Sequence, residues 1–198
     1  MIKRNYLKHG DIIEICLGHE WGFGYAKVVD PRKLQDPFEY PLILRIYDFN
    51  SKSQIISTNS LSRDLLMAPI WISHYAGVIK RQEWTIIANE PIFLEEEFIP
   101  HTKQSWPPLL PDPKKWGYYK KFDTHMIFED YEKVKHLDYK SGYPVEIIAF
   151  VIKLELNKKY QKGNIMINNW LEQVYFDRRI DLPVFSKLDQ ELQGRVKK

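Results

Sequence analysis

The side chains that most often carry out chemistry in proteins are scattered along this chain. Its single cysteine, Cys16, lies in an alternating apolar segment and is expected to be an inert strand residue. No two histidines are spaced i, i+4, as a zinc site built from local sequence would need; the six are His9, His19, His74, His101, His125 and His136. There is no Gly-x-Ser-x-Gly motif and no glycine-rich phosphate loop. We therefore expect no catalytic residue, no metal and no cofactor, and hence a protein that is not an enzyme.

A run of acidic residues is the first candidate for a contact site. Residues 88–99 contain four glutamates and no lysine or arginine. This pattern is typical of a solvated loop, but an acidic patch also speeds association with a basic partner protein. The nearby rings of Phe93, Phe98 and Trp106 could equally belong to the core or to the centre of an interface. The first candidates for contact with a partner are Glu95, Glu96, Glu97 and Trp106.

A second charged segment has the opposite sign. In residues 114–121, two lysine pairs bracket Trp116, Tyr118 and Tyr119. Rings interleaved with lysines are typical of a platform for single-stranded nucleic acid, and also of an edge strand that avoids pairing with other chains. The formal net charge of +3 is too small to indicate nucleic-acid binding by itself. A nucleic-acid-binding β-barrel is the alternative function, and an enzyme site assembled from distant segments is a third class.

The elements that would position these residues are mostly strands in the first half of the chain. Alternating and β-branched runs predict them at residues 11–17, 23–29, 42–49, 70–81 and 83–89. Residues 100–113 hold five prolines, which remove backbone donors and favour extended backbone. We therefore expect neither a helix nor a central strand there, and a boundary between the two halves.

The second half is predicted to mix strands and helices. Residues 121–128 and 144–156 are predicted strands, the latter buried because it is mostly apolar. Residues 129–137 and 164–179 are predicted helices. The second helix has apolar residues on one face at 3.6-residue spacing, namely Ile167, Trp170, Leu171, Val174 and Tyr175.

These elements predict an α+β fold that is mainly antiparallel β. The strands should form a strongly bent sheet or a small barrel, with a C-terminal helix. We expect one compact domain over residues 1–198, in which residues 5–110 form the β core and residues 114–198 add strands and a helix packed on it.

The most informative segment, residues 10–30, reads GDIIEICLGHEWGFGYAKVVD and predicts a β-hairpin. After its short loop, Gly22, Gly24 and Ala26 form a face without large side chains, which lets another backbone or a ring approach closely. The loop supplies the next candidates for partner contact, which are His19, Glu20 and Trp21.

This hairpin resembles the opening of the immunity protein 26 family of bacterial polymorphic toxin systems. The family pattern G-D-x-x-x-[IV]-x-L is matched by Gly10, Asp11, Ile15 and Leu17. An aromatic-glycine-aromatic element and a β-branched strand follow, as Phe23, Gly24, Tyr25, Val28 and Val29. Further similarity lies in the strand at residues 42–49 and in a tryptophan-centred strand at residues 83–87, and the resemblance covers about residues 5–110.

The resemblance implies an immunity protein that binds a cognate toxin and blocks it by occlusion, without catalysis. The chain has one cysteine, no apolar run of about 18 residues and a polar N-terminal segment, which together predict a cytoplasmic protein that does not enter the membrane. Nucleic acid is not the expected partner. The sequence leaves open which toxin is bound and the oligomeric state.

Overall fold

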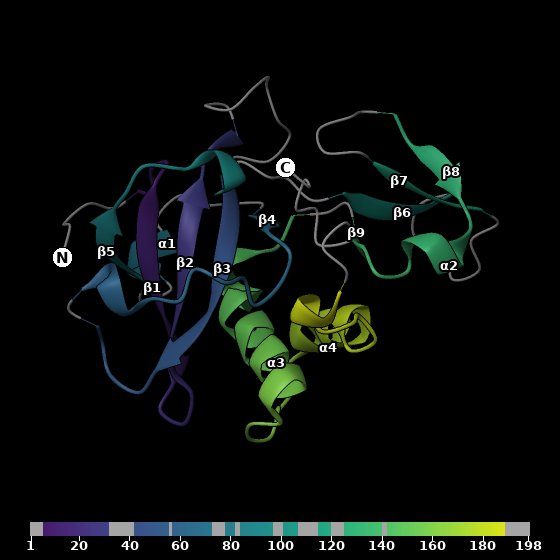
Figure 1. Ribbon diagram of the computed structural model, residues 1–198. Helices are drawn as coiled ribbons and strands as arrows, with labels where there is room; N and C mark the ends of the chain where they lie inside the picture. Colours follow the sequence, from purple (N-terminus) through teal and green to yellow (C-terminus); the bar gives the residue numbers. More distant parts are fainter. Residues whose placement is uncertain are drawn as a thin grey trace.

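The structure is a computed structural model that describes residues 6–31, 42–55, 57–72, 78–81, 84–96, 101–106, 115–119, 125–139 and 142–188. Within these residues, nine strands form two sheets with helices beside them (Figure 1). This arrangement confirms the predicted α+β class with mainly antiparallel strands. Neither sheet closes on itself in the described residues, so the open sheet is the correct one of the two predicted forms.

The first sheet contains five antiparallel strands in the order β4-β3-β2-β1-β5. Their bounds are β1 (Asp11–Gly18), β2 (Gly22–Val29), β3 (Leu42–Ser51), β4 (Ile70–Ile72) and β5 (Thr85–Asn89). The predicted hairpin is β1 and β2, which pair Ile13 with Ala26 and Cys16 with Phe23. The large core lies on one face of this sheet, and a smaller apolar cluster around Tyr25 and Tyr47 lies apart from it.

Residues 144–156 were predicted to be a buried strand, and this prediction is wrong. A 3₁₀ turn, η4 (Val145–Ile147), leads into helix α3 (Ile148–Tyr160). The helix is buried on most of its surface, so it has no polar stripe that would show a helical period in the sequence. A buried apolar helix and a central strand cannot be told apart by periodicity alone.

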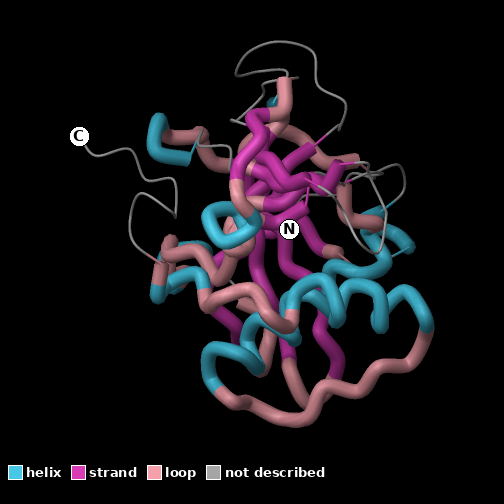
Figure 2. Tube along the Cα trace, turned by 90° about the vertical axis from the view of Figure 1, so that its right-hand side faces the viewer, coloured by secondary structure: helices cyan, strands magenta, loops and turns pink. Residues whose placement is uncertain are grey.

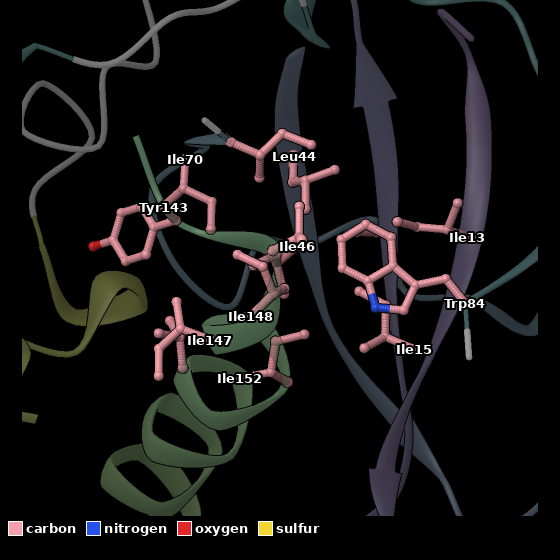
Figure 3. Close-up of a cluster of buried hydrophobic side chains, with 14 of the residues drawn as sticks. Ile13, Ile15, Leu44, Ile46, Ile70, Trp84, Tyr143, Ile147, Ile148 and Ile152 are labelled. Atoms are coloured by element: carbon pink, nitrogen blue, oxygen red, sulfur yellow. The ribbon is translucent and has the colours of Figure 1, made fainter. Parts of the chain in front are cut away.

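Helix α3 covers the face of the first sheet to which β2 contributes the small residues Gly24 and Ala26. A Cβ atom on Gly24 would lie 3.2 Å from Cγ2 of Ile152, so the expected close approach to this face is confirmed. Figure 3 shows Ile148 and Ile152 of α3 close to Ile46 of β3, with Trp84 further along the same core. The main core therefore joins the β strands of the first half of the chain to a helix of the second half.

The second sheet has the order β8-β7-β6-β9, with β6 and β9 parallel. Its strands are β6 (Thr102–Trp106), β7 (Lys115–Tyr119), β8 (Ile127–Glu129) and β9 (Asp138–Tyr139). The prediction that residues 100–113 hold no central strand is wrong, because β6 pairs on both sides. It fits between Pro100 and Pro107, where every residue keeps its backbone N–H.

Two other elements are shorter than predicted. The strand expected at residues 70–81 ends at Ile72, and α1 (Val78–Arg81) follows as a helix. The helix expected at residues 129–137 is reduced to α2 (Tyr131–Val134). The remaining elements are the 3₁₀ turns η2 (Thr58–Ser60), η3 (Leu94–Glu96) and η5 (Phe185–Lys187).

Helix α4 (Trp170–Arg179) begins later than the predicted residue 164, because Asn169 caps it. The Asn169 side chain accepts a hydrogen bond of 2.9 Å from the backbone N–H of Glu172. In Figure 2 the helices α3 and α4 and the loop between them lie in the lower part of the molecule, where the ends of several strands also reach. No helix in the described part of the chain is both long and apolar enough to cross a membrane.

Candidate functional site

The loop of the β1–β2 hairpin presents two of the predicted contact residues to solvent. Glycines in the left-handed region, Gly18 (φ 94°) and Gly22 (φ 73°), flank the loop and let the chain reverse. His19 and Glu20 are exposed at its tip, whereas Trp21 is buried. The loop therefore offers two polar side chains to a partner and turns its ring inward.

Trp21 holds the hairpin loop against the loop between α3 and α4. A Cβ atom on Gly163 would lie 3.1 Å from Cζ2 of Trp21, so the ring packs directly on this glycine. The backbone carbonyl of Trp21 accepts a hydrogen bond of 3.1 Å from the Asn50 side chain, and the carbonyl of Glu20 accepts one from Lys52. These contacts fix the shape of the loop, and Trp21 acts as a wall of the space beside it.

That space is a pocket of about 230 Å³ between the hairpin loop, α3 and the segment before α4. Apolar and polar side chains both line it, from Leu17, His19, Glu20, Trp21, Phe150, Lys153, Asn164, Ile165, Met166 and Asn168, together with Gly18. Pockets for drug-sized ligands and cofactors usually span about 300–1,000 Å³. This pocket is smaller and suits a single inserted side chain better than a cofactor.

An exposed apolar surface continues from the pocket onto α4. We call it the α4 surface and define it by Met166, Ile167, Trp170 and Val174. Met166 lines the pocket and is 73% exposed, and Trp170 is 74% exposed. Tryptophan and methionine are enriched at protein interfaces, and a cluster of exposed large apolar residues marks an interaction surface. Of the face predicted from the sequence, Leu171 and Tyr175 pack against the core together with Phe176, whereas Ile167, Trp170 and Val174 are exposed.

The two arginines of α4 point into the protein. Arg178 and Arg179 reach the carboxylate of Asp138 on β9 at 2.7 and 2.5 Å. Arg179 also binds Glu155 of α3 at 2.8 Å, and Lys158 donates to the same carboxylate at 3.0 Å. Burial alone would raise the pKa of Asp138, but the two arginines hold it well below its usual range. Because every member has a charged partner, this cluster is structural.

Lys103 is another buried group whose pKa is strongly shifted. Burial lowers the pKa of Lys103 to about 8. Its Nζ donates to the carbonyl of Lys135 at 2.6 Å and lies 5.0 and 5.6 Å from the ring centroids of Tyr139 and Tyr131. The amine is enclosed by these groups and does not line the pocket beside the hairpin loop.

The predicted acidic site is partly used inside the protein. Glu96 is 8% exposed, and its carboxylate binds Nζ of the fully buried Lys27 at 2.5 Å. Glu90 pairs with Arg63 at 2.9 Å. Sequence reasoning missed both pairs because the cations lie 69 and 27 residues away. The side chains of Glu95 and Trp106, and all of Glu97, lie outside the described residues, so their predicted role stays a prediction.

The lysine-aromatic segment also differs from the predicted platform. The Trp116 ring packs against Tyr131 and Tyr139, at centroid distances of 4.7 and 6.1 Å. Lys115 lies 5.3 Å from the ring centroid of Phe128. Trp116 thus packs on rings of α2 and β9, and Lys115 lies over a ring of β8, which does not favour stacking of this segment with bases. Among the described residues no group of three or more His, Cys, Asp or Glu could hold a metal ion.

An open β-sheet with an exposed apolar surface and enclosed ionic clusters has the features of a protein that binds another protein. Comparison with protein families matches residues 8–107 to immunity protein 26. The match covers just over half of the chain, and the chain belongs to this family, as its hairpin indicated. Comparison with curated proteins and with solved structures gave no match.

Proposed function

We propose that this protein is a non-catalytic immunity protein that binds a cognate toxin of a bacterial polymorphic toxin system in the cytoplasm and blocks it by occlusion. Membership of the immunity protein 26 family supports the immunity role. The observation that carries the binding role is the α4 surface, where Trp170 exposes most of its side chain. When such a tryptophan becomes buried in a complex, it typically dominates the energy of the interface.

The position of the α4 surface fits an occluding protein. A stable complex of standard size covers about 800 Å² on each partner. The α4 surface, the pocket and the tip of the hairpin loop adjoin one another, since Met166 belongs to the first two and His19 and Glu20 line the pocket. We propose this continuous region as the toxin-binding face, with the predicted contacts at Glu95, Glu97 and Trp106 as an untested second area.

The partner can be captured with the full chain. Tagged protein is mixed with the lysate and secreted fraction of its own organism, and the proteins that remain bound in moderate salt are identified by mass spectrometry. We expect one toxin fragment in near-equal amount. Calorimetry then compares wild type with Trp170→Ala, which should weaken binding by about 2 kcal/mol, or roughly thirtyfold.

Leu94→Ala tests the second proposed area, because Leu94 is 83% exposed and directly precedes Glu95 in the turn η3. If Leu94→Ala weakens binding and Trp170→Ala does not, the toxin contacts the acidic run instead of the α4 surface. Recovery only of nucleic acid that salt removes would contradict the immunity function and favour the alternative at Trp116.

A further inference from the structure

The pocket beside the hairpin loop has the dimensions and walls of a receptor for one side chain. Its volume is about 230 Å³, and Leu17, Trp21, Phe150 and Ile165 give it apolar walls. Trp21 is held in place by Gly163 and Asn50, so the pocket is formed before a partner arrives. Preformed apolar pockets reduce the entropy cost of binding.

The C-terminal end of α4, which lies beyond Trp170 as seen from this pocket, carries exposed negative charge. Asp177 and Asp181 are exposed, while Arg178 and Arg179 are bound by Asp138 and Glu155. The positive charge of α4 is therefore turned inward, although the chain as a whole has a formal net charge of +3. Lys153 lines the pocket itself, so the excess of negative charge lies towards the C-terminal end of α4.

The pocket, the Trp170 ring and the carboxylate of Asp177 lie along one line on the surface. Met166 belongs to the pocket wall, Trp170 and Val174 are one helical turn apart, and Asp177 follows three residues later. Since each helical residue rises about 1.5 Å, Asp177 lies about 10 Å along the axis from Trp170. A short segment of a partner can reach from the pocket to this carboxylate.

We infer that the pocket receives an apolar side chain from a basic segment of the partner protein, whose lysines or arginines lie along the acidic end of α4. This inference rests on the proposed function and specifies the chemistry of the toxin surface. Charge complementarity of this kind sets the specificity and the association rate, and the apolar anchor supplies affinity.

Three acetylated octapeptides are the probes, so the test does not depend on the toxin being known. The first has a phenylalanine, a glycine-serine linker and two lysines; the second replaces the lysines by glutamates; the third replaces the phenylalanine by alanine. Amide shifts of the full-length ¹⁵N-labelled protein are followed by NMR. The first peptide should shift residues 17–21, 164–168 and 177 with saturation, roughly threefold more tightly than the second. The third should not saturate.

A charge reversal makes the test specific. Asp177→Lys should reverse the preference between the lysine and glutamate peptides. Glu132→Lys, which reverses the charge of another exposed carboxylate on α2, should leave this preference unchanged. Equal affinity for the two charged peptides, shifts that map elsewhere, or no saturable binding would overturn the inference. So would shifts of the same amides on raising the concentration of the protein alone, because a second copy would then occupy the pocket.

The two proposals can fail separately. If a toxin is captured and depends on Trp170 while the peptides miss the pocket, the immunity function stands and the pocket inference is wrong. If the peptides bind as expected and no toxin is recovered, the pocket is a receptor and the immunity function loses its support.

Discussion

At the level of single residues, a carboxylate in an acidic run can have opposite roles depending on what lies across the fold. Glu96 belongs to such a run but neutralises Lys27, which is completely buried in β2. Its carboxylate also accepts a hydrogen bond of 3.0 Å from the backbone N–H of Phe93, and its carbonyl accepts one from Arg45. Glu96 thus fastens the turn η3 to the first sheet.

Glu96→Gln should destabilise the protein by about 3 to 5 kcal/mol, because it leaves the buried Lys27 charge without a counter-ion. Urea unfolding at neutral pH measures this change. Glu20→Gln, on the exposed hairpin tip, is the control and should change stability by no more than about 0.5 kcal/mol. Equal stability of the two variants would show that Glu96 does not compensate Lys27.

Between elements, Asp138 connects the second sheet to the helices. It is the carboxylate of β9 that both arginines of α4 reach, and the hydroxyl of Tyr143 also donates to it. Because its pKa is depressed in the folded state, Asp138 stabilises the fold above its unfolded pKa of about 4. That contribution is lost as the pH falls below this value towards the folded pKa.

Asp138→Asn should lower the free energy of unfolding at neutral pH by about 3 kcal/mol, because two buried arginines lose their shared partner. The difference in unfolding free energy between wild type and variant should narrow on acidification below about pH 4, where the Asp138 carboxyl becomes protonated in the unfolded chain while it is still ionised in the folded protein. Urea titrations at several pH values measure both quantities. A gap that stays constant down to strongly acid pH would mean that the charge of Asp138 is not the source of its effect.

Across the whole molecule, the family segment does not contain its own complete core. The match ends at residue 107, but Ile148, Val151 and Ile152 of α3 belong to the same buried cluster as the strands β1, β2 and β3. The candidate binding face also combines both parts of the chain. Its hairpin loop belongs to the family segment, whereas Met166 and Trp170 lie after it. We therefore propose that residues 1–198 form one cooperative domain.

A fragment of residues 1–110 should not fold, because the sheet face around Gly24 would lose its covering helix and expose apolar side chains. Circular dichroism should show no cooperative thermal transition for the fragment and one transition for the full chain. Binding of a hydrophobic dye by the fragment would support the same conclusion. A cooperative transition of the isolated fragment would instead make residues 114–198 a separate unit.

The sequence by itself determined the features that arise from local spacing. The alternation on both sides of the loop at His19 and Glu20 predicted the β1–β2 hairpin. The residues of its two strands also indicated the family. The mainly antiparallel fold followed from five β-rich segments in the first half, which left a bent sheet and a small barrel as alternatives. These features depend on neighbours in the chain, which is why a single sequence reveals them.

Only the tertiary structure decided which side chains are exposed and which are buried or paired. Most of residues 144–156 belong to helix α3, which is largely buried between the first sheet and α4, and a largely buried helix cannot be told from a buried strand by the period of its sequence. With α3 filling the core, α4 packs through Tyr175 and leaves Trp170 exposed. The Glu96 carboxylate pairs with a lysine 69 residues away and is therefore buried. Burial and ion pairing depend on contacts between distant segments, and no local pattern encodes them.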